Sequence, residues 1–234
     1  MAVVKGPGEM GKFRVLGVVA AVAWVVFGIT LVIRLMAGDG GLLAAEMLRE
    51  APPEYTGLPE GEYPGVGKMT ADYLAGRTDT FRYVIADGAG GQAECFRPNE
   101  AAHMADCRGL IRLDETVCAV CLAAAAALTA AGLIPSAGRK GFLRGILYGL
   151  RTAGVLAAGM LIWALADFDG LFITFHRAAF TNEGWLMDPR ENLLIRLMPE
   201  GFFVRLGIRG LLRALVMPAA LEAAARIGLR RVRG

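Results

Sequence analysis

Long windows of apolar residues are the feature that most constrains the fold of this chain. Four such windows occur, at residues 15–36, 117–134, 145–166 and 202–221. A helix of about 20 apolar residues crosses the roughly 30 Å hydrocarbon core of a bilayer. Apolar residues make up 55% of the 234 residues, above the roughly 45–50% of an ordinary soluble domain. We therefore predict an all-α integral membrane protein, a bundle of four transmembrane helices.

The first and last windows admit other interpretations. The first follows Lys12 and Arg14, as in a signal peptide, but it exceeds the roughly 7–15 apolar residues of such a peptide and no A-x-A cleavage pattern follows it. We interpret it as an uncleaved anchor. The last window carries Arg205, Arg209 and Arg213, whose spacing of four forms one stripe on a helix. Each arginine costs roughly 2.5–3.5 kcal/mol at mid-membrane, so the stripe faces carboxylate partners, a wet wall beside a site, or the membrane surface.

The distribution of charge predicts the topology of the chain. Lys and Arg gather in the cytoplasmic loops of membrane proteins. Here the short loop 135–144 has Arg139, Lys140 and Arg144 and no acid, whereas Asp and Glu concentrate in two other segments. Those acidic segments, 37–116 and 167–201, are predicted to be extracytoplasmic. The predicted cytoplasmic parts are the N-terminal tail, the short loop and the basic C-terminal tail, residues 1–14, 135–144 and 222–234.

The long outer segment 37–116 is predicted to form a small cap. Proline and glycine recur between Pro52 and Gly67 and indicate turns. The run Thr80–Ile85 is typical of a strand, and Asp87-Gly88 follows it as a turn. The cap is therefore expected to contain short strands.

The two histidines of the chain, His103 and His176, both fall in the predicted outer segments. Imidazole has an ordinary pKa near 6.5, so it exchanges protons at neutral pH, and such acid–base work contributes about 10²–10⁴ in rate. Two histidines without an HExxH motif do not by themselves predict a zinc site, which takes three or four ligands. A metal held with the help of Asp106 or Asp188 is an alternative. The single serine, Ser136, lies in the cytoplasmic loop. An outward-facing serine nucleophile is therefore excluded.

A glycine-rich motif near the N-terminus suggests nucleotide binding. Residues 6–12 match a P-loop, but Phe13 replaces the Ser or Thr that holds magnesium, and no strand fits before the motif. We predict a flexible basic tail instead.

The cysteines suggest redox chemistry. Cys118-x-x-Cys121, together with Cys95 and Cys107 in the cap, resembles the four-span oxidoreductases that pass electrons from thiols to quinone. The Val, Ala and Leu residues that flank the first pair favour a second interpretation, in which cysteine is a small apolar filler. A non-catalytic membrane scaffold whose cap binds a partner is a further alternative.

Two blocks of the sequence match a known pattern. The first is Phe96-x3-Glu100-x2-His103-Met104-x-Asp106-x3-Leu110, and the second is Phe172-x2-Phe175-His176-x3-Phe180-x4-Trp185-x2-Asp188-Pro189. With four spans and a large first outer segment, the chain resembles the bacterial lipoprotein intramolecular transacylase family. Cys107 and Arg108 stand where that pattern has Val and Lys, a difference that is not expected to touch the chemistry.

The resemblance implies an activity. The sn-2 acyl chain of the diacylglyceryl group on a lipoprotein's N-terminal cysteine would move to the α-amine of that cysteine, giving a lyso-form lipoprotein. No acyl-enzyme, nucleotide, metal or other cofactor is implied. The expected partners are a diacylated lipoprotein and membrane lipids, with no nucleic acid. The expected enzyme is a monomer in the bacterial plasma membrane, with its site at the extracytoplasmic face.

The two blocks also supply the predicted site residues. His103 and His176 are the catalytic pair, one as general base and the other to stabilise the oxyanion. Asp106 is expected to orient the ring of His103, and Glu100 and Asp188 give further support. The predicted substrate-binding residues are Met104, Phe172, Phe175, Phe180, Trp185 and Arg205.

Overall fold

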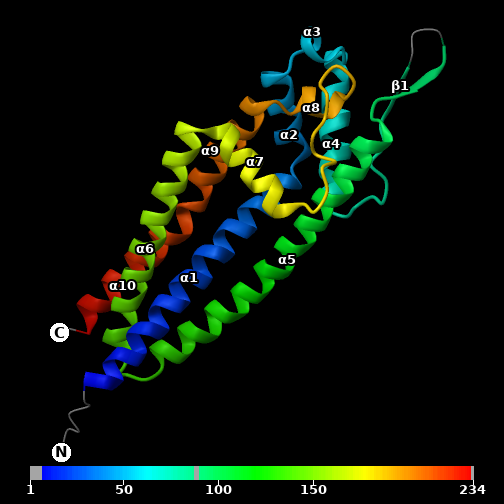
Figure 1. Cartoon of the computed structure of the whole chain (residues 1–234). Coiled ribbons are helices and arrows are strands. Elements are labelled where there is room, and N and C mark those ends of the chain that lie inside the picture. Colours follow the sequence, from blue (N-terminus) through cyan, green and yellow to red (C-terminus); the bar gives the residue numbers. More distant parts are fainter. Residues whose placement is uncertain (1–6, 87–89, 233–234) are drawn as a thin grey trace, which may run out of the picture. The chain divides into compact units, whose positions relative to one another are not determined.

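The computed structural model describes residues 7–86 and 90–232, and Figure 1 traces them from the blue N-terminal helix to the red C-terminal helix. The chain divides into two compact units. Unit 1 contains the described residues up to Leu31, Thr116–Leu171 and those from Leu212 on, and unit 2 contains Val32–Glu115 and Phe172–Leu211. In chain order the elements are α1 (Pro7–Ala37), α2 (Gly40–Glu50), α3 (Pro53–Thr56), η1 (Glu60–Glu62), α4 (Tyr63–Leu74), β1 (Val84–Ala86), β2 (Gln92–Glu94), α5 (Pro98–Leu133), α6 (Arg139–Ala166), α7 (Phe168–Ala179), α8 (Leu193–Leu197), α9 (Glu200–Ala214) and α10 (Val216–Arg231).

Three helices among the described residues are long and apolar enough to cross a membrane: Gly11–Ala37, Pro98–Leu133 and Arg139–Ala166. They contain the first three predicted windows. The fourth window, residues 202–221, lies on α9 and α10, which are separated at Leu215. The 15 residues of α9 fall short of the roughly 20 that a span needs. The predicted fold class is confirmed in this form: a mostly helical protein with long apolar helices and a small two-stranded sheet.

Two smaller predictions concern the N-terminus and the cap. Gly6 of the P-loop-like motif lies outside the described residues, and from Pro7 onward the chain is helical. Of the predicted strand Thr80–Ile85, only Val84 and Ile85 lie in a strand, β1. This strand pairs with β2 in antiparallel register, Val84 opposite Glu94. Asp87 and Gly88 lie outside the described residues.

In unit 1, glycines let α1 and α6 approach at backbone distance. A Cβ on Gly17 would collide with the Cα of Gly145, and a Cβ on Gly145 would collide with the carbonyl oxygen of Arg14. Gly149 meets Ala21 of α1 one turn further on. Small residues four apart are typical of helix contacts in membranes, where close packing holds helices together. The buried residues of this unit's core are Ala20, Ala21, Phe142, Leu143, Ile146 and Ala225.

Replacing Gly145 with valine is expected to lower thermal stability, because the side chain has no room at this contact. Overpacking of this kind costs about 1–3 kcal/mol. The matched control is Gly154→Val, since Gly154 lies on the same helix and no described atom stands within 4 Å of its would-be Cβ. The midpoint of thermal unfolding in detergent should fall for Gly145→Val alone, and equal midpoints for both variants would contradict the contact.

In unit 2, α2 and α4 pack against the first turns of α5 and against α8 and α9. Met47 of α2 and Val66 of α4 are fully buried, and Met104 of α5 joins the same core. The Tyr63 hydroxyl at the start of α4 donates to the carbonyl oxygen of Ala51 after α2. Met104 is the residue next to His103 on α5, so this core anchors the turn that carries His103. Its other buried members are Leu43, Leu58, Ala71, Tyr73, Phe81, Phe96, Leu193, Leu194, Leu197 and Phe202.

Candidate active site

His103 lies one turn beyond a tightly capped helix start. Arg97 precedes α5, Pro98 is its first residue, and the third residue, Glu100, accepts the Arg97 backbone N–H at 2.6 Å, as in one half of a capping box. The other oxygen of Glu100 accepts the backbone N–H of Leu194 at 2.6 Å. The Glu100 side chain is fully buried. It therefore ties the start of α5, and His103 with it, to α8.

The structure brings the two histidines together. His176 lies in the last turn of α7, and its ring centroid is 6.2 Å from that of His103, with the ring planes inclined by 27°. Two imidazoles at this spacing can contact one small functional group between them. The two blocks found in the sequence thus converge on one site.

The tautomer of His176 follows from its hydrogen bond. Its Nδ1 lies 2.8 Å from the carbonyl oxygen of Phe172, one turn earlier in α7. A carbonyl oxygen only accepts, so Nδ1 carries the hydrogen and Nε2 of the neutral ring keeps a free lone pair. The side chain is 7% exposed. This burial lowers the pKa of His176 below its ordinary value, while the hydrogen bond to Phe172 opposes the shift. At neutral pH the ring can therefore accept a proton at Nε2.

Four of the predicted aromatic residues form a shell around His176. The ring centroids of Phe172, Trp185, Phe175 and Phe180 lie 3.9, 4.9, 5.3 and 5.5 Å from that of His176. Phe180 also lies 5.2 Å from the ring of His103. Such a shell excludes water from the imidazoles and offers an apolar wall to a hydrocarbon chain.

His103 is held by a residue that the sequence analysis left out of the site. Cys107 Sγ, one turn later on α5, lies 3.5 Å from His103 Nε2. Cys107 was expected not to touch the chemistry, but its contact with a predicted catalytic ring makes it a candidate site residue. Its spacing of four from His103 was the signal that could have found it. The other ring nitrogen, Nδ1, is buried without a hydrogen-bond partner among the residues that the structure describes. Buried polar atoms of this kind are rare and call for an explanation, such as a bound ligand.

Asp106 makes a different contact from the predicted one. Its carboxylate accepts a hydrogen bond from Asn182 Nδ2 at 2.9 Å, whereas the ring nitrogen of His103 meets Cys107. Asn182 belongs to the segment 180–192, which joins α7 to α8 and which we call the strap. Asp106 therefore fastens one end of the strap to α5.

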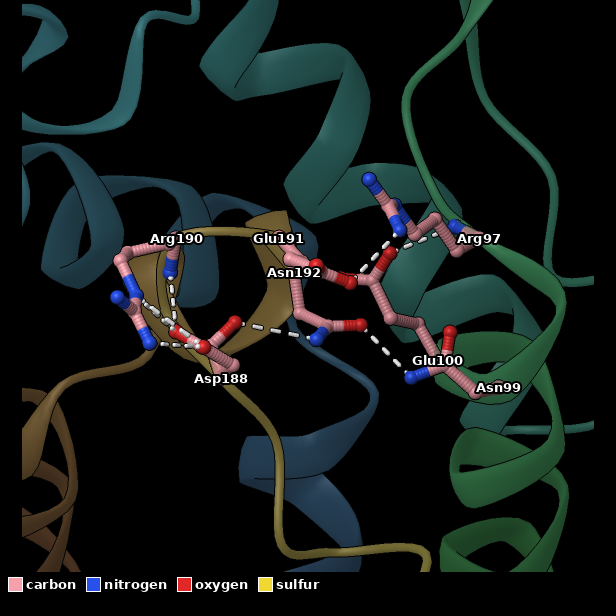
Figure 2. A network of polar contacts seen from close by, with 7 residues as sticks. All are labelled: Arg97, Asn99, Glu100, Asp188, Arg190, Glu191 and Asn192. Atoms are coloured by element: carbon pink, nitrogen blue, oxygen red, sulfur yellow. Dashed lines mark hydrogen bonds and ion pairs between the residues drawn. The ribbon is translucent and has the colours of Figure 1, made fainter.

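The other end of the strap is fastened to the start of α5 (Figure 2). Asn99 Nδ2 donates to Asn192 Oδ1 at 2.7 Å, and Arg97 Nη1 donates to Glu191 Oε2 at 3.0 Å. Trp185 lies between the two fastened ends, against His176. Contacts between residues more than 70 positions apart thus hold the two ends of the strap, with Trp185 between them, beside His176.

Asp188 makes its hydrogen bonds within the strap. Its carboxylate accepts hydrogen bonds from Arg190, which hold the pKa of Asp188 below its usual range. Its carbonyl oxygen accepts from Asn192 Nδ2 at 3.1 Å (Figure 2). Asp188 therefore shapes the turn before α8, and no described contact joins it to either histidine.

Arg205 pairs with carboxylates of α2. Its Nε lies 2.7 Å from Glu46 Oε2 and 3.3 Å from Glu50 Oε1, and Arg209 Nη2 lies 2.5 Å from Glu46 Oε1. Glu46 is 1% exposed, and a charge so deeply buried needs such partners. For these two arginines the first interpretation of the stripe, carboxylate partners, is the one observed.

Two further features expected from the sequence concern metal ligands and the four cysteines. Within residues 7–86 and 90–232, no group of three or more His, Cys, Asp or Glu side chains lies close enough together to hold a metal ion. Cys95, Cys107, Cys118 and Cys121 are free thiols. Among these thiols, Cys107 is the one that contacts a histidine of the site.

Comparisons with known proteins agree with this fold. A family model described as "Lipoprotein intramolecular transacylase Lit" matches residues 18–203, which include both histidines. A structure of the membrane integral lipoprotein intramolecular transacylase Lit from Bacillus cereus has a TM-score of 0.77 at 18% identity and covers 95% of this chain and 98% of that one. Two variants of that protein, with a histidine changed to arginine or alanine, have TM-scores of 0.70 at 17% identity, covering 97% of this chain and 95% and 96% of theirs. No curated protein sequence matches the chain. The chain thus has the fold of a multi-pass integral membrane protein.

Proposed function

Because this chain belongs to the lipoprotein intramolecular transacylase family and is therefore an acyltransferase, we propose that it moves the sn-2 acyl chain of a lipoprotein's S-diacylglyceryl group to the α-amine of the N-terminal cysteine. The product is a lyso-form lipoprotein, which is N-acylated and keeps one ester-linked chain. The observation that carries this proposal is the pairing of His176, whose Nε2 is a free acceptor, with His103 at 6.2 Å inside an aromatic shell.

In the proposed step, the α-amine attacks the carbonyl carbon of the ester. A C–N bond forms, and the proton of the amine passes to His176 Nε2. The C–O bond to the glyceryl oxygen then breaks, and the imidazolium of His176 returns the proton to that oxygen. His103 lies beside His176 and stabilises the oxyanion that forms on the ester carbonyl oxygen between the attack and the cleavage of the C–O bond. An amide replaces an ester, and the proton that leaves the amine ends on the glyceryl oxygen. The step therefore needs no oxidant, nucleotide or acyl-enzyme.

The energetics suit a single imidazole base. The ordinary pKa of an α-amine, about 7.7–8.0, is within two units of that of imidazole, so the proton transfer costs little. The amine and the ester belong to one substrate molecule. Holding them in register can lower the barrier by several kcal/mol, up to roughly 7–11 at the best effective molarities.

The aromatic shell is the proposed wall for the acyl chain. Phe172, Phe180 and Trp185 bracket the imidazoles, and Phe175 is 53% exposed, so that its ring extends the wall outward. The strap holds Trp185 in this wall. We propose that the acyl chain lies along these rings while its ester reaches the two histidines.

We further propose that the site faces the extracytoplasmic side of a bacterial plasma membrane, with both termini in the cytoplasm. The basic loop 135–144, which has no acid, supports this orientation. At 36 residues, α5 is about 54 Å long, well beyond the roughly 30 Å hydrocarbon core, so the turn that carries His103 can stand outside it. Both catalytic groups come from one chain, which supports action as a monomer.

The decisive experiment is mass spectrometry of lipoprotein N-terminal peptides from a bacterial host that lacks its own N-acylating enzymes. With this protein expressed, peptides that carry an N-acyl group and a monoacylglyceryl group should appear. The same host with an empty vector is the control. If the peptides remain diacylglyceryl with a free amine although the protein is present in the membrane, the proposed function is wrong.

The acid side of the pH profile should reflect the buried base. Protonation of His176 removes its acceptor, so kcat/KM falls as the pH drops through the pKa of this group. The α-amine of the free substrate titrates separately, at about pH 7.7–8.0. Because burial lowers the pKa of His176, a second, more acidic step should lie below about pH 6.5. The measurement is kcat/KM of the purified enzyme in detergent between about pH 5 and 9. A profile with no step below 6.5 would contradict a desolvated base.

A further inference from the structure

The hydrogen bond between Cys107 and His103 bears on the chemistry of the second histidine. The thiol contacts one ring nitrogen, Nε2, while Nδ1 is buried with no hydrogen-bond partner in the described part of the chain. The ring faces of His176 and Phe180 are the nearest aromatic neighbours, at 6.2 and 5.2 Å between centroids. Cys107 is therefore placed to control which nitrogen of His103 carries the proton.

The direction of this hydrogen bond sets the tautomer. A thiol is both a weak donor and a weak acceptor, and a neutral imidazole has one N–H and one lone pair. If the S–H donates to Nε2, the ring proton is on Nδ1. If Nε2–H donates to sulfur, Nδ1 is a bare acceptor. The two cases give His103 opposite roles toward a substrate.

We propose that Cys107 is a positioning residue whose S–H donates to His103 Nε2 and so keeps the ring proton on Nδ1, from which it is donated to the carbonyl oxygen of the ester. This inference rests on the proposed function, because it concerns the ester bound at the same site. His176 Nε2 already supplies an acceptor for the amine proton. With a second acceptor at His103, neither imidazole would offer a donor to the developing oxyanion.

The burial of Nδ1 agrees with this direction. A donor aimed at a developing oxyanion from a site without water acts far more strongly than it would in water. In the substrate-free protein such a donor has no partner, as observed for Nδ1. The ester oxygen of a bound substrate then satisfies it, in the way that buried unpaired groups at functional sites are usually explained.

The tautomer can be measured without activity. The chain has two histidines, so His176→Gln leaves one imidazole, and ¹⁵N-histidine labelling of that variant gives the nitrogen signals of His103 alone in the full-length protein in detergent. We expect the neutral ring to show a protonated Nδ1 and an unprotonated Nε2. In His176→Gln with Cys107→Val, Nε2 has no thiol donor, and the population of the Nε2–H tautomer should rise. A protonated Nε2 in the presence of Cys107 would overturn the proposal.

Kinetics provide the second readout in the otherwise unchanged enzyme. Cys107→Val keeps a side chain of similar size but has no donor, and we expect kcat to fall about 2- to 10-fold with KM unchanged, the range of one lost hydrogen bond. Cys107→Ser restores a donor and should recover most of the rate. The matched control is Cys95→Ala, a half-buried cysteine of the same unit with no described contact to either histidine.

Failure of the proposed function and failure of the role proposed for Cys107 give different results. If the unmodified protein forms no N-acylated product, the proposed function fails, whatever the ¹⁵N signals show. If the product forms but Cys107→Ser is as slow as Cys107→Val, with all thermal midpoints equal, the thiol acts by packing and its role as a donor is wrong. A variant that loses its thermal transition is replaced by Cys107→Ala, for which the same tautomer shift and rate loss are expected.

Discussion

Replacing His176 with glutamine is expected to slow N-acylation by roughly 10²–10⁴-fold. Glutamine keeps a hydrogen-bonding side chain of similar length, so the aromatic shell stays filled, but its amide cannot take up a proton. The base at Nε2 is lost while the fold remains. The measurement is the initial rate at which the purified variant converts a diacylated lipoprotein to the lyso form, followed by mass spectrometry.

The control for this variant is its neighbour on α7. Arg177 is exposed, and Arg177→Gln should keep the rate of the unmodified enzyme. Thermal midpoints of both variants should match it as well. If His176→Gln keeps its midpoint and retains a rate within about ten-fold of the unmodified enzyme, His176 is not the base and the proposed step must be redrawn.

The second large effect is expected on stability, at Glu100. The fully buried carboxylate of Glu100 accepts the backbone N–H of Arg97 (Figure 2) and that of Leu194, each at 2.6 Å. Glu100→Ala leaves both donors without this partner. Each unsatisfied buried donor costs about 1–3 kcal/mol. We therefore expect a loss of roughly 2–6 kcal/mol, seen as a lower midpoint of thermal unfolding in detergent.

Two companion variants make the Glu100 experiment specific. Glu100→Gln keeps one accepting oxygen and should lose about half as much stability. Glu60→Ala removes an exposed carboxylate of the same unit and should leave the midpoint unchanged. An unchanged midpoint for Glu100→Ala would show that the link between α5 and α8 contributes nothing, and that His103 is held in place by other contacts.

Several members of the site were predicted from the family resemblance, because the pattern that carries it is local in the sequence. His176 and its neighbours Phe172, Phe175 and Phe180 lie within nine consecutive residues, and helical spacing is compatible with bringing their rings to one region. The pattern around His103 was equally informative. The pairing of the two blocks was expected from their shared side of the membrane, and the 6.2 Å spacing confirms that they meet.

Other parts of the site could not be predicted because their partners are distant in the chain. Asp106 was expected to orient His103, and the structure adds a partner 76 positions away, Asn182, which donates to its carboxylate. Arg205 was expected to bind substrate, and the structure pairs it with Glu46, 159 positions away. A charged side chain can pair with many partners, and which of them it meets depends on how the helices pack rather than on its own neighbours in the sequence.

The sequence by itself indicated the environment of this protein and the positions of its imidazoles. Its apolar windows are long enough to cross a bilayer, and its two histidines, His103 and His176, are the side chains whose ordinary pKa lies closest to neutral pH. Only the tertiary structure decided which nitrogen of each ring is free. A carbonyl oxygen faces Nδ1 of His176, and a thiol faces Nε2 of His103. A ring proton follows the hydrogen-bond partner, and the side chains that close around a ring are selected by packing.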